Sequence, residues 1–573
     1  MTLSGKSAAP GIAVGRIFVY NKNLFLPNES YITSGEEQSH LDRYLFIKKE
    51  ALDELEEIKI SMNKHDPRKA EIFTAHQEII NDVIINEEIP SRIQNDKWAG
   101  DWAIYQVYET FLIVLRKTAD PLISERADDF SDVRNMLLRL WYGQKKEGFN
   151  FLNEPVIIAA HDLLPSDTAS MDHSKVLAFI TTTGSLTSHA AIIAKSCGIP
   201  AVMGIEGLFD NVTHGQMAAV NADEGLVILE PDDEVTGEYE RKYAAFQKEK
   251  QEAETYLYGE AYTSDGEKIE IGLNISSVNE KTMEAQSFTD FAGLFRTEFL
   301  FMGRDSLPSE DEQFNVYRKV LESFGKRPVI LRTLDIGGDK PISSIFLPHE
   351  ENPFLGNRAL RFCFSYPDIF ITQIKAALRA SVYGNLMLML PMVSSLDDFR
   401  KAKEYFKSAQ VELEKEGMPF ADVKIGIMIE IPSIALVSDL AAGEVDFASI
   451  GSNDLCQYLC AADRMNNTVE NYYQSYHPAL FRLIYEIVKS FKSSGKPISI
   501  CGELSCDPLA VPVLIGLGLK RLSMGAASVA AVKRIISSVD SKKCEEMAEK
   551  VLKLPTAADI KKYLTDESSL LSG

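Results

Sequence analysis

The sequence lacks the features that mark a secreted or membrane-embedded protein. Residues 1–6 contain no apolar segment of the kind that forms a signal peptide. No apolar run in the 573 residues approaches the roughly 18 residues that a membrane helix needs. We therefore expect a cytoplasmic protein that does not insert into a membrane.

Cysteine is scarce and shows no pattern. The chain has seven cysteines, an odd number, and they are scattered along it. The pairs Cys456/Cys460 and Cys501/Cys506 do not have the paired spacing of a zinc site. We expect a reduced chain without a disulfide framework.

Nucleotide-binding motifs and an excess of positive charge are also missing. The chain has no Walker A loop and no kinase glycine-rich loop, so nothing in it indicates a nucleotide substrate. The 60 basic residues are outnumbered by 83 acidic ones, which gives a net charge of −23. This balance argues against nucleic-acid binding and suits a basic protein partner, although solubility alone explains it equally well.

The first half of the chain predicts an α/β domain that a helical segment interrupts. Strand patterns occur within residues 1–20 and return from residue 156 onward, whereas the residues between them show helical periodicity. The helical patterns cover residues 35–63, 68–87, 99–118 and 131–142. We predict that 33–144 is an inserted helical bundle and that 1–32 and 145–230 form one α/β domain.

The second half predicts a linker helix and a (β/α)8 barrel. Residues 231–261 are rich in Glu, Lys and Ala without proline, which predicts a helix that spaces two domains and leaves hinges at its ends. In 262–573, short apolar runs alternate with helical patterns, as expected for parallel strands buried on both faces. The predicted strands are 269–274, 292–296, 328–334, 386–392, 425–430, 447–450, 498–501 and 521–523.

In the predicted α/β domain, a loop of small polar residues precedes a predicted helix. An apolar helical pattern begins near His189 and ends at Gly198-Ile199-Pro200. Thr187 or Ser188 can cap this helix, which places His189 in its first turn. The free backbone N–H groups there keep the imidazole neutral and favour a phosphate on it. We expect His189 to be phosphorylated during turnover; a hydrogen-bonded structural histidine is the alternative.

Polar residues follow the predicted barrel strands, where the carboxyl ends of the strands meet on one face. The arginines among them are suited to phosphate and carboxylate, and the acidic residues are suited to Mg²⁺. A cysteine at such a position is a candidate proton donor or nucleophile, although structural ion pairs and a packing cysteine are the alternatives. These residues are Arg296, Arg332, Glu430, Asn453, Asp454, Arg464 and Cys501. They predict a site for a small dianion bound with Mg²⁺.

The chain resembles the enzyme I family of the bacterial phosphoenolpyruvate:sugar phosphotransferase system along essentially its whole length. In the first half, the resemblance rests on Glu125-Arg126-Ala127, Ser166-Asp167-Thr168 and Thr187-Ser188-His189. In the barrel it rests on Gly293-Leu294-Phe295-Arg296-Thr297-Glu298-Phe299-Leu300-Phe301-Met302, Arg332-Thr333-Leu334-Asp335-Ile336-Gly337-Gly338-Asp339-Lys340, Gly426-Ile427-Met428-Ile429-Glu430, Gly451-Ser452-Asn453-Asp454-Leu455 and Cys501-Gly502-Glu503.

The resemblance implies an enzyme, a phosphoenolpyruvate-protein phosphotransferase active in sugar uptake. It implies that His189 takes the phosphoryl group of phosphoenolpyruvate and passes it to a histidine of the carrier protein HPr. It assigns phosphoenolpyruvate binding to Arg296, Arg332, Asn453, Asp454 and Arg464, Mg²⁺ binding to Glu430 and Asp454, and enolate protonation to Cys501. It also implies that 33–144 binds HPr and that 262–573 forms a homodimer.

The loop around His189 differs from the family's usual pattern, which favours the first of two alternatives, whereas Thr187-Ser188-His189-Ala190-Ala191 also resembles the loops of the second. The family usually has a glycine at Ser185, a basic residue at Leu186 and an arginine at Lys195. One alternative is a regulatory protein that senses phosphoenolpyruvate with impaired or redirected transfer. The other is a relative of pyruvate–phosphate dikinase or phosphoenolpyruvate synthase that lacks their ATP-binding domain.

Overall fold

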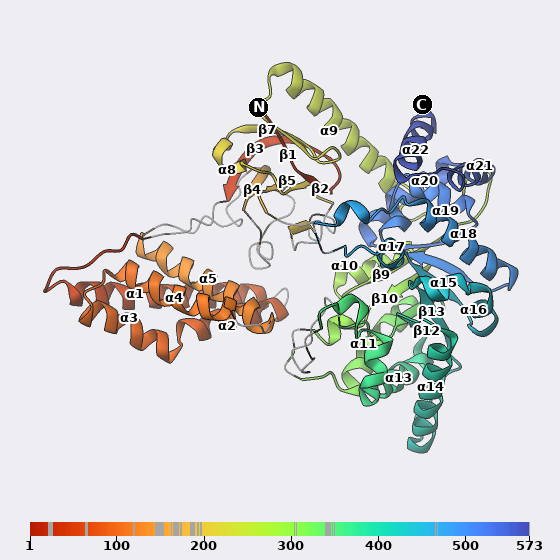
Figure 1. Cartoon of the computed structure of the whole chain (residues 1–573), viewed down its shortest axis with the longest axis horizontal. Coiled ribbons are helices and arrows are strands. Elements are labelled where there is room, and N and C mark those ends of the chain that lie inside the picture. Colours follow the sequence, from red (N-terminus) through yellow and green to blue (C-terminus); the bar gives the residue numbers. More distant parts are fainter. Residues whose placement is uncertain are drawn as a thin grey trace. The chain divides into compact units, whose positions relative to one another are not determined.

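The structure is a computed structural model of the chain (Figure 1). It divides into two compact units, Met1–Phe246 and Gln247–Gly573. It describes all residues except 21–26, 64–66, 118–120, 144–153, 162, 164–170, 172–174, 184–189, 192–193, 195–197, 303, 305, 338–344, 346–347, 349, 465, 467 and 572–573.

The first unit contains a mixed eight-stranded sheet. Its strands lie in the order β1-β8-β7-β3-β4-β5-β6-β2. The four central strands β3, β4, β5 and β6 pair in parallel, and the other pairs are antiparallel. The strands are β1 (Thr2–Ser4), β2 (Lys6–Ala9), β3 (Ile12–Tyr20), β4 (Val156–Ala160), β5 (Val176–Thr181), β6 (Ala201–Met203), β7 (Met217–Asn221) and β8 (Leu226–Leu229).

Both faces of this sheet are buried, because successive strand residues point to opposite sides. In β4, Ile158 packs into one core together with Ala190 and Ala191, which lie directly after His189. Ile157 packs into the opposite core together with Leu208 of the short helix α8 (Leu208–Asn211). Burial on both sides explains why β4 is an uninterrupted apolar run.

The inserted segment is helical, as predicted, but its helix boundaries differ from the prediction. The predicted helix at 68–87 is two helices, because the Asp82 carboxylate caps a new one by accepting the N–H groups of Ile84 at 2.9 Å and Ile85 at 3.1 Å. The last helix begins at Pro121, ten residues before the predicted start. The helices are α1 (Glu37–Asn63), α2 (Pro67–Ile80), α3 (Val83–Asn95), α4 (Gly100–Lys117) and α5 (Pro121–Trp141).

Helix α9 (Asp233–Glu254) occupies the predicted linker segment. Its first half packs on the sheet, where Tyr239 is buried with Ile12 and Ala219. Its second half belongs to the second unit, where Glu249 and Glu252 pair with Arg534 at 3.6 and 3.9 Å. The boundary between the two units therefore falls inside this helix and not at its ends.

The second unit is a closed barrel of eight parallel strands (Figure 1). Each observed strand overlaps a predicted one, so the predicted α/β fold with a C-terminal (β/α)8 barrel is confirmed. The strands are β9 (Glu270–Ile275), β10 (Phe291–Phe295), β11 (Pro328–Arg332), β12 (Asn385–Leu390), β13 (Lys424–Ile429), β14 (Ala448–Gly451), β15 (Ile498–Cys501) and β16 (Arg521–Met524).

Helices surround the barrel, and the main core lies between them and the strands. No helix in the described part of the chain is both long and apolar enough to cross a membrane. The helices are α10 (Glu280–Ala285), α11 (Glu310–Phe324), α12 (Leu360–Ser365), α13 (Pro367–Ala380), α14 (Leu396–Glu416), α15 (Pro432–Leu436), α16 (Ser438–Glu444), α17 (Ser452–Cys460), α18 (Pro478–Ser493), α19 (Ala510–Gly516), α20 (Ala526–Ser538), α21 (Ser541–Val551) and α22 (Ala557–Leu571).

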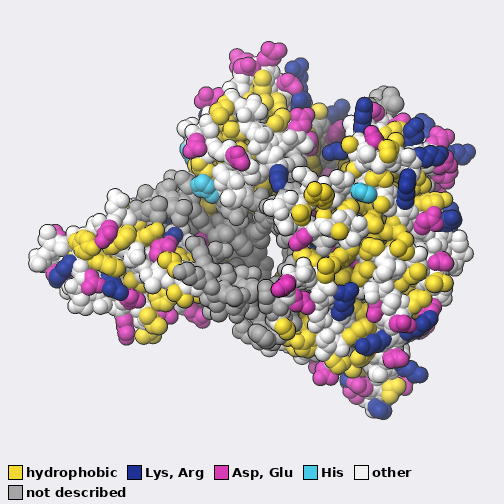
Figure 2. All heavy atoms as spheres, viewed as in Figure 1, with side chains coloured by type: hydrophobic (Ala, Val, Ile, Leu, Met, Phe, Trp, Pro, Cys, Tyr) yellow, Lys and Arg dark blue, Asp and Glu magenta, His cyan; other side chains and the backbone are white. Residues whose placement is uncertain are grey.

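The surface carries charges of both signs. Figure 2 shows Asp and Glu side chains beside Lys and Arg over the described part of the visible face. Such interspersion keeps a chain with a net charge of −23 from presenting only acidic groups on this face.

Candidate active site

The predicted barrel residues gather at the carboxyl ends of five strands. Because the carboxyl ends of parallel barrel strands open onto one face, residues at these positions share a site. They are Arg296 directly after β10, Arg332 at the end of β11, Glu430 directly after β13, Asn453 and Asp454 in the first turn of α17 after β14, and Cys501 at the end of β15.

A chain of ion pairs connects several of these residues. Asp335 Oδ2 lies 2.9 Å from Arg332 Nη2, and Asp335 Oδ1 lies 3.0 Å from Arg358 Nη2. Arg358 Nη1 lies 3.3 Å from Asp454 Oδ1, and Arg464 Nη2 lies 3.8 Å from that oxygen. Arg358 and Asp335 are each 1% exposed, so water screens the central pair very little. Arg332, Asp454 and Arg464 are thereby held in one charged network.

Glu430 is buried with one carboxylate oxygen satisfied and the other not. Its Oε1 atom accepts the N–H of Met392 at 2.7 Å, while its Oε2 atom has no hydrogen-bond partner among the residues that the structure describes. Burial raises the pKa of Glu430, and the negative charges of Asp454 and Asp335 raise it further. A buried oxygen without a donor calls for a cation or a proton beside it.

Arg332 is held in the interior as a charged group. It is 5% exposed and donates to Glu298 of the short 3₁₀ turn after β10. Burial alone lowers the pKa of Arg332, but the negative charges of Asp335, Glu298 and Glu430 outweigh it and keep the guanidinium ionised. Its Nε atom is buried and has no hydrogen-bond acceptor in the described part of the chain. This orphan donor suits an anionic ligand.

Cys501 is a buried thiol at the same face. Its Sγ atom donates to the carbonyl oxygen of Ile450 at 3.5 Å, and its side chain is 3% exposed. Burial raises the pKa of Cys501, and Glu430 acts in the same direction, while Arg332 and Arg296 oppose them. The group is therefore protonated at neutral pH, as a proton donor must be.

Asn453 is oriented by the loop after β15. Its Oδ1 atom accepts the N–H of Glu503 at 3.1 Å, which directs its amide NH₂ group elsewhere as a donor. Gly502 makes this approach possible, because a Cβ atom on it meets Ser452 Oγ at 2.3 Å and its φ of +101° is left-handed. The glycine in Cys501-Gly502-Glu503 is therefore a packing requirement of the site.

The two remaining predicted site residues are Arg296 and His189. The side chain of Arg296 is exposed, but its charge is close enough to act on the Cys501 thiol. His189 lies outside the described residues. Its loop leaves β5 through Thr183, whose N–H donates to the carbonyl oxygen of His161 after β4 at 3.0 Å, and Ala190 is buried against the sheet.

The chain was compared with known protein families and with curated proteins. Three family descriptions match: "PEP-utilising enzyme, N-terminal" at residues 4–126, "PEP-utilising enzyme, mobile domain" at 152–225 and "PEP-utilising enzyme, PEP-binding domain" at 250–541. Relatives named phosphoenolpyruvate-protein phosphotransferase include those of Staphylococcus carnosus, 38% identical over 97% of both chains, and Bacillus subtilis, 37% identical over 98% of this chain and 99% of the relative. The Enterococcus faecalis relative is 38% identical over 96% of both chains.

The chain belongs to the phosphoenolpyruvate-protein phosphotransferase family. The resemblance predicted from the sequence is confirmed, and so is the prediction that the chain is an enzyme of this kind. The strand-end residues from Arg296 to Cys501 lie within the region that matches the PEP-binding domain of this family. His189 lies within the region that matches the mobile domain.

Three buried residues of this phosphotransferase site were not predicted as site residues. Arg358 precedes α12 and does not follow a strand, so the strand-end rule did not select it. Asp335 and Glu298 belong to motifs that carried the resemblance, but only the structure shows them pairing with Arg332. The sequence could have indicated only Glu298 and Asp335, because they lie within three residues of Arg296 and Arg332.

Arg358→Met is expected to destabilise the barrel of this phosphotransferase. The variant removes the 3.0 Å contact of Asp335 and the 3.3 Å contact of Asp454, and breaking a buried ion pair costs roughly 3–5 kcal/mol. The measurement is the free energy of unfolding of the barrel in denaturant. Arg400→Met is the control, because its pair with Glu444 is exposed, and it should change little. Equal losses in the two variants contradict a structural role for the buried network.

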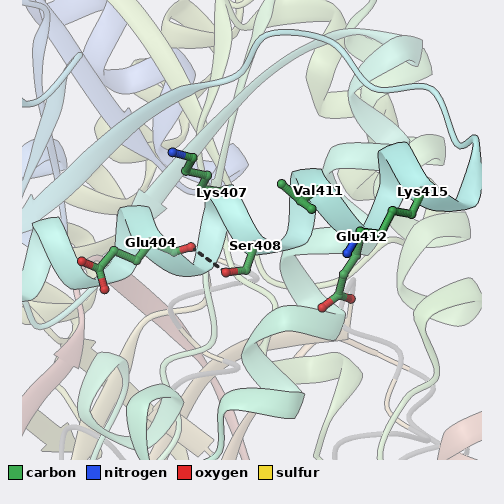
Figure 3. A pocket seen from close by; sticks show the side chains of 6 residues that line it. All are labelled: Glu404, Lys407, Ser408, Val411, Glu412 and Lys415. Atoms are coloured by element: carbon green, nitrogen blue, oxygen red, sulfur yellow. Dashed lines mark hydrogen bonds between the residues drawn. The ribbon is translucent and has the colours of Figure 1, made fainter.

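A pocket on the outside of the barrel contains none of these residues. All six residues that line it come from one helix, α14, and they are Glu404, Lys407, Ser408, Val411, Glu412 and Lys415 (Figure 3). None of the residues that line this pocket lies at a strand end or in the buried ion-pair network. The pocket therefore lies apart from the candidate site at the strand ends.

Proposed function

We propose that this chain transfers the phosphoryl group of phosphoenolpyruvate to His189 and then to a histidine of an HPr-like carrier protein, with release of pyruvate. The observation that carries the proposal is the set of orphaned groups at the strand ends. The Nε atom of Arg332 needs an acceptor, and Glu430 Oε2 needs a positive neighbour. Phosphoenolpyruvate bound with Mg²⁺ supplies both.

Buried and more exposed arginines are proposed to bind phosphoenolpyruvate in different ways. Arg332 is buried and fixed by Glu298 and Asp335, so it is preorganised to bind an anionic group of the substrate. The Arg464 side chain is 21% exposed and lies 3.8 Å from Asp454, and Arg296 is exposed at the rim. These two side chains can close on the substrate, and the amide of Asn453 adds an uncharged donor. Together they offset the charge of the transferring phosphoryl group.

Glu430 and Asp454 fit a Mg²⁺ site completed by substrate. Mg²⁺ typically takes one or two carboxylates together with substrate phosphate oxygens and water. When bound, the ion offsets charge on the phosphoryl group and the enolate oxygen. Glu430 and Asp454 hold it next to the arginines.

Glu430→Gln and Asp454→Asn are expected to weaken the response to Mg²⁺. Each removes one anionic ligand without changing side-chain size, and losing several kcal/mol of charge stabilisation slows phosphorylation roughly 10²-fold or more. The measurement is the rate of phosphorylation by phosphoenolpyruvate as Mg²⁺ is titrated. Glu444→Gln, an exposed carboxylate paired with Arg400, is the control. A variant with the parent's Mg²⁺ dependence shows that the ligands lie elsewhere.

We also propose a docking surface for the carrier, an oligomeric state and a cellular location for this chain. The bundle α1–α5 is proposed to dock the carrier, and its exposed apolar side chains Phe46, Val83 and Val114 support such a contact. The net charge of −23 suits a basic carrier. We further propose a cytoplasmic homodimer formed through the barrel, acting at the first step of sugar uptake.

One experiment separates this function from the two alternatives. The full-length protein is incubated with radiolabelled phosphoenolpyruvate and Mg²⁺, with HPr, without HPr, and with AMP and pyrophosphate in place of HPr. Label that appears on the protein and moves to HPr supports the proposal. Label that never leaves the protein, or no label despite phosphoenolpyruvate binding, favours the sensing alternative. Label that moves from the protein into ATP when AMP and pyrophosphate are present favours the dikinase alternative.

A further inference from the structure

Helices α11 and α13 pack next to each other around the barrel, and a buried amide lies between them (Figure 1). This amide is the side chain of Gln373, which is 1% exposed on α13. A carboxamide has an acceptor oxygen and two donor N–H groups, and leaving them unpaired in the interior costs free energy. The partners of Gln373 therefore show which parts of the chain it holds.

Gln373 connects the loops that follow β10 and β11. Its Oε1 atom accepts the N–H of Leu334, two residues after β11, at 2.8 Å. Its Nε2 atom donates to Thr297 Oγ1, two residues after β10, at 3.1 Å. The fully buried Thr297 hydroxyl then donates to the carbonyl oxygen of Arg332 at 3.1 Å. The backbone of Arg332 is thereby tied to the residue that follows Arg296.

The same amide also fixes the far end of the loop after β10. Gln373 Nε2 donates to the hydroxyl of Tyr317 on α11 at 3.2 Å, and this hydroxyl donates to Gln313 Oε1 at 3.0 Å. The amide of Gln313 donates to the carbonyl oxygen of Pro308 at 3.1 Å, directly before α11 is capped. The loop 296–308 is therefore held at both of its ends by a network that includes Gln373.

The network has a single direction. Each of its two hydroxyl oxygens, on Thr297 and Tyr317, accepts one hydrogen bond and donates another. Tyr317 is fully buried and Gln313 is 1% exposed, so water does not replace a partner that is lost. A buried polar network with its bonds satisfied in this way is rigid and favours one arrangement of the segments that it joins.

These segments carry both acids that hold Arg332. Glu298 directly follows Thr297, and Asp335 directly follows Leu334. Arg332 Nη2 pairs with both carboxylates, with Asp335 at 2.9 Å. A shift of either segment therefore moves a partner of the Arg332 guanidinium.

We propose that Gln373 is a positioning residue for phosphoenolpyruvate binding. It fixes Glu298 and Asp335 relative to each other, and through them it fixes the direction in which the Arg332 guanidinium points. Gln373 acts through these residues and not by contact with the substrate. This inference rests on the proposed binding of phosphoenolpyruvate by Arg332 and adds a residue of α13 to that site.

Gln373→Met is expected to weaken phosphoenolpyruvate binding while the number of binding sites stays the same. Methionine has a similar length and offers neither the amide donors nor the amide oxygen. A charge-assisted hydrogen bond corresponds to roughly 10–100-fold in affinity, so a misdirected Arg332 should raise the Kd by that order. The measurement is calorimetry with phosphoenolpyruvate and Mg²⁺ on the full-length protein in the His189→Ala background, where no phosphoryl group is transferred. A lower number of sites at an unchanged Kd indicates only a loss of folded protein and overturns the proposal.

Ser381→Ala is the control for a loss of stability alone. Ser381 is 2% exposed between α13 and the beginning of β12, away from the carboxyl ends of the strands. Its hydroxyl accepts the N–H of Ala421 at 2.8 Å and donates to the carbonyl oxygen of Leu378 at 2.6 Å. The variant leaves a buried N–H without its acceptor, so it should be less stable and should bind phosphoenolpyruvate with the parent's Kd.

Variants of Thr297 test the step between Gln373 and Arg332. Thr297→Val keeps the shape without the hydroxyl and should raise the Kd, whereas Thr297→Ser keeps the hydroxyl and should recover most of the affinity. The double variant Gln373→Met/Thr297→Val should bind no more weakly than Gln373→Met, because both changes remove the same contact. Additive losses overturn the proposal. If Gln373→Met does not fold, the comparison of valine with serine decides.

Arg332→Met separates this inference from the function on which it rests. In the same assay this variant should bind phosphoenolpyruvate far more weakly than Gln373→Met does. If Arg332→Met binds like the parent, the proposed substrate site is wrong and the role of Gln373 is overturned with it. If Arg332→Met loses binding while Gln373→Met keeps the parent's Kd, the substrate site stands and only the role of Gln373 is overturned.

Discussion

His189→Ala is expected to take up no acid-labile label from phosphoenolpyruvate, which is a complete loss of phosphorylation. The sequence predicts that His189 lies in the first turn of a helix, where a neutral imidazole is a nucleophile and the free N–H groups stabilise the phosphate that it acquires. Alanine has no atom that can accept the group. The measurement is the stoichiometry of label on the full-length protein with Mg²⁺ present.

A second histidine of the same unit provides the control. His161 directly follows β4, and its Nδ1 atom lies 2.9 Å from Thr182 Oγ1 in the strand-to-loop connection that leads to His189. His161→Ala should still be labelled, and both variants should bind phosphoenolpyruvate like the parent because the barrel is unchanged. Stoichiometric label on His189→Ala together with its loss from His161→Ala identifies His161 as the carrier.

Cys501→Ser is expected to slow pyruvate formation by roughly 10²–10⁴-fold, the range of general acid catalysis. The enolate that remains after phosphoryl transfer must receive a proton on its methylene carbon. The buried Cys501 thiol is protonated at neutral pH and lies with Arg332 and Glu430 at the strand ends. A serine hydroxyl has a similar shape and is a far weaker acid. The measurements are pyruvate formation with HPr present and phosphoenolpyruvate affinity by calorimetry.

A packing role for Cys501 predicts a different pattern. Cys544 of α21 is also buried, and Cys544→Ser tests the cost of a hydroxyl in the barrel core away from the strand ends. We expect Cys544→Ser to lower stability and leave turnover within a few-fold of the parent, while Cys501→Ser keeps its affinity and loses turnover. If Cys501→Ser also stays within a few-fold, the proton comes from another group.

The barrel and its strand-end residues were predictable because parallel strands have a simple sequence signature. A strand buried on both faces must be an apolar run, and the polar residue that ends it, such as Arg332 or Glu430, must lie at the carboxyl face. The helical bundle was less predictable. A single capping residue, Asp82, divides one periodic segment into α2 and α3, and apolar periodicity alone does not locate that break.

The fold class, the family and the positions of the polar groups follow from local sequence patterns. Which of these groups pair with one another depends on how the chain packs. Asp335, Arg358 and Asp454 meet because the barrel closes, and no local rule relates residues so far apart in the chain. The same holds for Glu430, whose one satisfied oxygen depends on the N–H of Met392 after β12, and for Gln457 of α17, whose Oε1 atom accepts the N–H of Arg464. Local pattern selects the chemistry of a position, whereas burial and partner distances come from the packing of distant segments.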